Sequence, residues 1–175
     1  GSERLRIDSS GRIGIGIADP DAYQSSSRDL VIGKASDAAG ITIRTGTSNG
    51  GYIRFADGTS GNQTYRGTIA YVHDGDYMIF ATDSTEKVRI TSAGQALVGT
   101  TSNRAINAHA PRVQISGTNY STSTVSLVNN AADATGAYLF FTKQRSGSAG
   151  GSTAVAQDDI IGDIRFTAGD GTDVE

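Results

Sequence analysis

One fifteen-residue sequence occurs twice in this chain, and it restricts the possible folds more than any other feature. The first copy, ERLRIDSSGRIGIGI, spans 3–17, and the second, EKVRITSAGQALVGT, spans 86–100, so the offset is 83 (86 minus 3). In the first copy Leu5 and Ile7 alternate with polar side chains, which is the period of a β-strand with one apolar face. A turn at Ser-Gly or Ala-Gly then leads into a second apolar strand. Each copy, called the cassette below, therefore predicts a β-hairpin.

The second strand of the first cassette alternates isoleucine with glycine. Ile13, Ile15 and Ile17 are expected to share one face of the strand, and Gly14 and Gly16 leave the other face without side chains. Glycine weakens a strand unless another backbone has to come close, so we expect a close backbone approach here. A loose edge hairpin is the alternative interpretation.

The segments around the cassettes predict further strands and a repeat, with no convincing helix. Strands are expected at 29–33, 41–44, 52–56, 67–73 and 77–82, with Asp74-Gly75 as a type I′ turn between the last two. The same order then returns: DLVIG is matched by RVQIS, ITIR by VSLV at 125–128, GGYIRF by GAYLFF at 136–141, and RGTIAYV by IGDIRFT at 161–167. The insert QRSGSAGGSTAVAQ raises the last offset to 95 (162 minus 67).

This order predicts three parts, because repeats of this length belong to quasi-linear architectures. Residues 1–17 are expected to be the C-terminal end of a preceding module, 18–100 a complete β repeat module, and 101–175 a following module that is truncated. We therefore expect the chain to be a piece of a longer fibre.

Composition favours a core that is thin or shared between chains. Only 37% of the residues are apolar, with 23 glycines and no tryptophan or cysteine, and large apolar side chains supply most of the free energy of burial. Without cysteine, disulfides and Cys-ligated metal sites are excluded. No apolar run approaches the roughly twenty residues of a membrane helix. A net charge of −3 without a basic cluster argues against nucleic acid as a partner.

ERLRIDSSGRIGIG, EKVRITSAGQALVGTTS and LFFTKQRSGSAGGSTAVAQDDIIGDIRFTAGDGTD resemble the repeated shaft modules of tailed-bacteriophage tail fibres. In those fibres such modules commonly lie upstream of an endosialidase-type intramolecular chaperone domain, which this sequence does not contain. The resemblance covers nearly the whole chain, although related cassettes also occur in trimeric bacterial surface adhesins. It implies an all-β, elongated homotrimeric fibre of stacked β-prism or β-sandwich modules, located in the virion tail fibre or, in the alternative, on a bacterial surface.

The same resemblance suggests partners and packing residues. The expected partners are two further copies of the chain and the neighbouring fibre modules, without membrane insertion; a host surface glycan is the alternative partner if this segment itself binds sugar. Three IGIGI strands around a threefold axis would bring Ile13, Ile15 and Ile17 together and let the bare glycine face approach its neighbours. In the second cassette Leu97 and Gly99 are expected to take this part.

No constellation in the sequence predicts catalysis, so we expect no catalytic residue, no metal site and no cofactor. His73 and His109 lie in no ligand or nucleophile spacing, and no serine lies in a GxSxG motif. A glycosidase needs only two acids roughly 5 to 10 Å apart, which leaves a polysaccharide depolymerase as an alternative, but Asp-Gly pairs are mostly turns. A twelve-residue calcium loop with its closing Glu is absent. The acids weighed are Asp74, Asp76, Asp158, Asp159, Asp163, Asp170 and Asp173.

Sugar binding is a further alternative, since flat aromatic rings beside hydrogen-bonding loops suit carbohydrates. The candidate contacts are Tyr65, Arg66, Tyr71 and Tyr77 near the predicted hairpin, and Lys143 and Arg145 in the long insert. Tyrosine is also a favoured strand residue, so a carbohydrate-binding module remains the rival of a shaft whose task is mechanical.

Overall fold

The computed structural model describes residues 3–34, 36–106 and 108–168, and it confirms the all-β class. Its strands are β1 (Leu5–Ile7), β2 (Ile13–Ile15), β3 (Leu30–Ile32), β4 (Gly50–Phe55), β5 (Gly67–Val72), β6 (Tyr77–Thr82), β7 (Thr85–Ile90), β8 (Ala96–Val98) and β9 (Val113–Ile115). Helical structure in the described residues is confined to three short 3-10 segments: η1 (Pro20–Ala22), η2 (Gly61–Tyr65) and η3 (Tyr120–Thr122).

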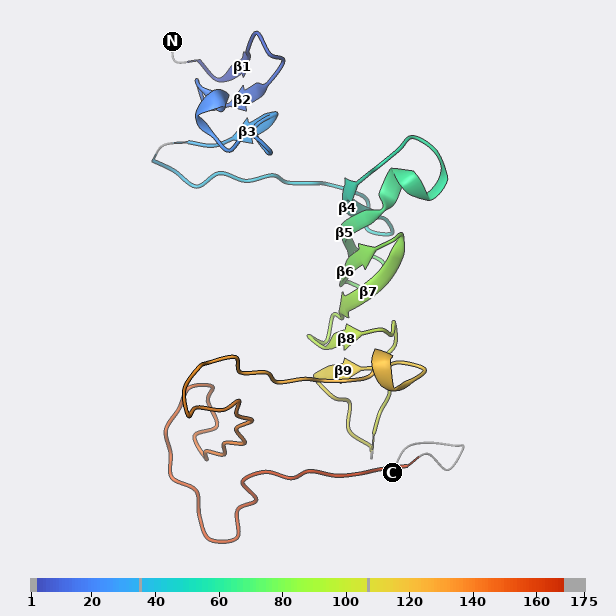
Figure 1. Ribbon diagram of the computed structural model, residues 1–175, viewed down its shortest axis with the longest axis vertical. Helices are drawn as coiled ribbons and strands as arrows, with labels where there is room; N and C mark the ends of the chain where they lie inside the picture. The colour runs from blue at the N-terminus through green and yellow to red at the C-terminus, as the bar shows by residue number, and fades with distance from the viewer. Residues whose placement is uncertain (1–2, 35, 107, 169–175) are drawn as a thin grey trace. The chain divides into compact units, whose positions relative to one another are not determined.

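The chain divides into two compact units, Gly1–Thr45 and Gly46–Glu175, and each contains one sheet. The first unit has the order β1-β2-β3, in which β1 is antiparallel to β2 and β3 is parallel to β2. The second unit has the order β4 to β9, antiparallel at every step except the parallel pair β8 and β9 (Figure 1). The predicted division at 17/18 and 100/101 is not tested by this partition and stays a prediction.

The two cassettes have the same backbone at two places along the chain. Leu5 lies opposite Ile15 in the first and Val88 opposite Val98 in the second, and each cassette then adds a parallel strand in the same register. The crossovers to that strand, 16–29 and 99–112, are equal in length, and both reach the dozen or more residues that parallel pairing requires. The sequence repeat is therefore a repeat of structure.

One of the predicted turns is wrong in its details. β5 and β6 do form a hairpin, but Val72 pairs with Tyr77, so the loop has four residues instead of the two expected for a type I′ turn at Asp74-Gly75. Positive φ falls on Gly75 and Asp76. A two-residue turn with positive φ at both positions lies instead between β6 and β7, at Asp83 and Ser84, with φ of 50° and 57°.

Four predicted strands are absent from the described residues: 41–44, 125–128, 136–141 and 161–167 have no regular ladder. A strand needs a partner on at least one edge to satisfy its backbone groups. The segments 136–141 and 161–167 match β4 and β5 in sequence, but among the described residues they form no ladder with each other or with another strand. Alternation of apolar residues is therefore not sufficient to make these four segments strands.

The core of the described structure is very small. Ala70 and Leu97 are its only buried hydrophobic side chains, at 2% and 0% exposure. Both lie on the same face of the six-stranded sheet, Ala70 on β5 and Leu97 on β8. The expectation of a thin core within one chain is therefore met, and most large apolar side chains remain in contact with solvent.

Candidate functional site

The largest organised surface of the second unit is one face of its six-stranded sheet. Because alternate residues of a strand point to the same side, the registers define two cross-strand rows. The first row consists of Ile53, Ile69, Phe80, Val88, Val98 and Ile115. The second consists of Gly51, Tyr71, Met78, Ile90, Ala96 and Val113. These twelve residues, called the apolar face below, include no charged side chain.

The opposite side, called the polar face below, is covered by the chain's own long side chains. The Arg89 guanidinium lies 3.9 Å from the centre of the Tyr77 ring, and it donates to both carboxylate oxygens of Glu86 at 2.7 and 2.8 Å. Its pKa is raised, first by the hydrogen bonds to Glu86. Arg54 lies 4.6 Å from the Tyr52 ring centre. These stacked cations occupy ring faces that a sugar would need.

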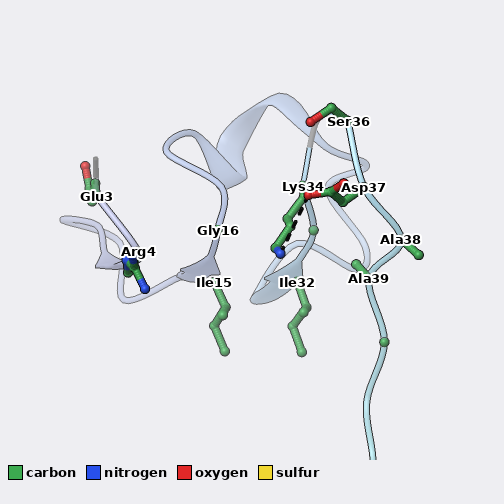
Figure 2. A pocket seen from close by; sticks show the side chains of 12 residues that line it. Glu3, Arg4, Ile15, Gly16, Ile32, Lys34, Ser36, Asp37, Ala38 and Ala39 are labelled. Atoms are coloured by element: carbon green, nitrogen blue, oxygen red, sulfur yellow. Dashed lines mark ion pairs between the residues drawn. The ribbon is translucent and has the colours of Figure 1, made fainter. Parts of the chain in front are cut away.

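The first unit repeats the apolar face on a smaller scale. Its three strands place aliphatic side chains on one side, namely Leu5, Ile7, Ile13, Ile15, Leu30 and Ile32. Figure 2 shows Ile15 and Ile32 pointing the same way, beside an open pocket of about 840 Å³. The pocket is also lined by Arg4 and by Lys34, whose Nζ lies 3.8 Å from a carboxylate oxygen of Asp37. It combines apolar surface with two cations and with the carboxylates of Glu3 and Asp37.

The close backbone approach predicted for the cassette glycines is present, and it comes from the same chain. Gly16 has a φ of 71°, and a Cβ added there would lie 2.3 Å from the carbonyl oxygen of Gly33. Gly99 repeats this with a φ of 75° and the carbonyl oxygen of Ser116, also at 2.3 Å. A Cβ on Gly14 would lie 2.4 Å from the carbonyl oxygen of Ile17. An additional axial role for these residues stays a prediction.

The isoleucines of the first cassette do not all belong to the strand. Ile13 and Ile15 lie on β2, but β2 ends at Ile15 and the left-handed Gly16 follows. Ile17 is half-buried, and its side chain lies next to Gly33. In the second cassette Leu97 is fully buried on the polar face, with Val98 on the apolar face. The glycine face and the isoleucine face thus have different surroundings.

The candidate sugar contacts are not brought together. Tyr71 lies on the apolar face, where its hydroxyl donates to Asp76 at 2.9 Å and this bond raises the Tyr71 pKa. Tyr77 lies on the opposite face beside Arg89. Tyr65, in η2, donates to Asn62 at 2.7 Å. The tyrosines therefore form no single aromatic platform.

The candidate cations are likewise engaged in local contacts. Arg66 pairs with Asp83 and with Asp57, the latter at 3.3 Å. Arg145 donates to both oxygens of Asp159 at 2.7 and 2.9 Å, which lowers the Asp159 pKa. Lys143 lies close enough to lower that pKa further.

The described acids also serve local structure. Asp74 and Asp76 lie in the β5–β6 loop, Asp163 pairs with Arg165 at 2.5 Å, and Asp170 and Asp173 lie outside the described residues. Among the residues that the structure describes, no three His, Asp or Glu side chains are grouped as metal ligands. The same residues include no helix long and apolar enough to cross a membrane. Comparison with protein-family models and with curated proteins finds no match to this chain.

Proposed function

We propose that this chain is a structural shaft segment of a homotrimeric fibre, of the kind found in tailed-bacteriophage tails, which spaces and presents the parts that bind the host. The observation that carries the proposal is the repeated cassette, whose two copies share one backbone and one register. A backbone repeated along the chain suits a structure that extends by adding similar units. The resemblance of the cassettes to shaft modules supports the same function.

The mechanism of such a segment is rigidity gained by burial between chains. The described part of one chain has two buried hydrophobic side chains, which is too small a core to stabilise this many strands alone. Association covers the exposed rows and thereby stabilises the folded state by mass action. Stiffness along the fibre then follows from sheets that are held on one side by neighbouring chains.

Size-exclusion chromatography with light scattering tests this proposal on the 175-residue chain. We expect about 54 kDa, three times the 18.1 kDa of one chain. A folded, stable species of one chain's mass would contradict it. A glycan array on the same sample separates the shaft from a carbohydrate-binding module, because a spacer should bind no glycan.

A further inference from the structure

We infer that the apolar face of the second unit is the surface on which a second copy of this chain packs, and that the polar face points to solvent in the assembly. This inference rests on the proposed fibre function and gives it a place in the structure. It differs from the sequence-based expectation, which placed the contact at the IGIGI strand and, in the second cassette, at Leu97 and Gly99.

The first argument is how much of the apolar face one chain leaves uncovered. Half of its twelve residues are large apolar side chains that are at least 37% exposed, namely Ile53, Tyr71, Phe80, Ile90, Val98 and Val113. Obligate interfaces are more hydrophobic than transient ones. A face of this composition therefore favours a permanent partner over a weak one.

The second argument is where the large apolar side chains lie. Ile53, Phe80 and Val113 belong to the apolar face and are 49%, 40% and 66% exposed. They span the sheet from its first strand to its last, so the exposed surface is continuous across all six strands. Continuous apolar patches of this extent are rare on monomers and mark interaction surfaces.

The third argument is the chemistry of the edge. At the β5–β6 hairpin the apolar face ends in Tyr71, whose ring packs edge-on against His73 with ring centres 5.0 Å apart. The Tyr71 hydroxyl is already satisfied by Asp76, so the ring can be covered without leaving an unpaired donor. An apolar centre with a polar rim is the usual anatomy of a protein interface.

The fourth argument selects a second copy over another partner. The twelve residues of the apolar face offer no charge and few hydrogen-bonding groups for a glycan or an acidic partner. They require an apolar surface of similar extent, and another copy of this chain presents one by definition. The corresponding face of the first unit has the same aliphatic character, so a fibre of such chains has matching surfaces in successive units.

Two neighbouring residues of β4 give a matched test. Ile53 on the apolar face and Tyr52 on the polar face are 49% and 45% exposed. We expect Ile53→Asp to raise the concentration at which the assembly dissociates by about a hundredfold or more, because a buried unpaired carboxylate is strongly unfavourable. Tyr52→Asp should change it less than about threefold, as for most surface substitutions. Equal effects in light scattering would overturn the assignment of the face.

A second measurement covers the case in which Ile53→Asp fails to fold. Since the chain contains no cysteine, Ile53→Cys and Tyr52→Cys each introduce a single thiol. In the assembled protein we expect a thiol reagent to label I53C at least about tenfold more slowly than Y52C, since the closed thiol reacts only after opening. Equal labelling rates in a trimer would overturn the assignment of the apolar face as the contact surface but would leave the fibre proposal intact. An unmodified chain that is monomeric would overturn both.

Discussion

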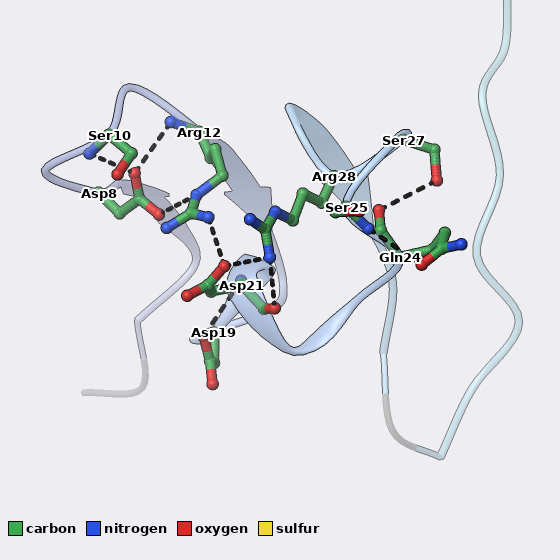
Figure 3. Close-up of polar contacts among 9 residues, drawn as sticks. All are labelled: Asp8, Ser10, Arg12, Asp19, Asp21, Gln24, Ser25, Ser27 and Arg28. Carbon is green, nitrogen blue, oxygen red and sulfur yellow. Dashed lines mark hydrogen bonds and ion pairs between the residues drawn. The ribbon is translucent and has the colours of Figure 1, made fainter.

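The two cassettes have one backbone but are held by different side-chain chemistry. In the first, Asp8 accepts hydrogen bonds from the backbone N–H groups of Ser10 and Arg12 at 2.8 and 3.0 Å and from the Arg12 side chain at 2.6 Å. Arg12 and Arg28 both pair with Asp21 of η1, which links the turn to the crossover (Figure 3). The first cassette thus has a charged network around its turn.

In the second cassette the same position is held by neutral groups. Thr91 takes the place of Asp8, and Gln95 the place of Arg12. The Thr91 hydroxyl donates to the Gln95 side chain at 3.1 Å and accepts from the Gln95 backbone N–H at 3.2 Å. The features that do not change are the left-handed glycines and the alternating apolar residues. These shared features set the backbone, whereas the polar contacts are exchangeable.

The largest expected effect comes from the glycines that both cassettes share. Gly16→Val and Gly99→Val each force a β-branched residue into left-handed φ and against a carbonyl oxygen, and the strain alone costs about 1–3 kcal/mol. Both should lower Tm by similar amounts in a thermal melt. Ser26→Val, in an exposed loop, is the control and should change Tm little. If Gly16→Val had the same Tm as the control, the two cassettes would not depend on equivalent glycines.

The next largest effect is expected at low pH, which should destabilise the first cassette more than the second. Burial acts to raise the pKa of Asp8, but the hydrogen bonds from Arg12 and Ser10 outweigh it, so the pKa lies below the ordinary value of 3.8. A lowered carboxyl pKa stabilises the fold above the ordinary pKa, and this stabilisation is lost as pH falls through the lower, folded value. We expect amides of β1 and β2 to lose hydrogen-exchange protection below about pH 4, before those of β7 and β8.

The variant Asp8→Asn provides the control for acid sensitivity. It keeps the size of the side chain but removes the carboxylate, so the difference between it and the unmodified chain should vanish at low pH. A constant difference across the whole pH range would show that the Asp8 charge does not cause the effect.

The second copy of the sequence that forms β4 and β5, at 136–141 and 161–167, gives a further test. A Cβ on Gly162 would lie 2.6 Å from Phe141, much as one on Gly67 would meet Phe55, its partner across β4 and β5. One contact typical of the β4–β5 pair is therefore present without the ladder. In the assembled protein we expect 136–141 and 161–167 to gain protection from hydrogen exchange, and unprotected amides in a trimer would contradict this.

The smallest effect is expected from exchanging the polar contacts. The double variant Asp8→Thr with Arg12→Gln gives the first turn the residues of the second. The Asp8 and Arg12 side chains are only 15% exposed, but Thr91 and Gln95 form hydrogen bonds of their own at the same place in the second turn. Tm should therefore fall by no more than about 2–4 °C and should depend less on salt. The reverse exchange, Thr91→Asp with Gln95→Arg, should introduce salt dependence into the second cassette, and its absence would show that the sequence context matters more than the pair.

Much of this fold could be predicted from local patterns. Alternation and the recurrence of the cassette were sufficient for the hairpins, because strand faces and turn glycines depend on neighbouring residues. The Asp83-Ser84 turn could not be predicted, since neither residue favours positive φ as glycine does. It depends on distant groups: the Ser84 N–H donates to the Arg66 carbonyl at 3.0 Å, and Asp83 pairs with the Arg66 side chain.

The candidate site was less predictable than the strands. Which apolar residues share a face across six strands depends on every register between them, including the shift next to Phe80. The close approach at Gly16 was expected, but its partner, Gly33, lies beyond a crossover whose path no local pattern specifies. The parallel pairing of β3 with β2 and of β9 with β8 was not predictable either, because a whole crossover separates the paired strands in the sequence.

The two equal crossovers also bear on how such a chain diversifies. Each leaves the sheet at a left-handed glycine and returns to a strand in the same register, yet 16–29 and 99–112 have largely different sequences. Their ends are fixed by the sheet, so the interior is free to vary in sequence while its length is kept. For protein engineering, the two crossovers are therefore equivalent insertion sites. Peptides of the same length can replace either one without a change in the sheet that carries it.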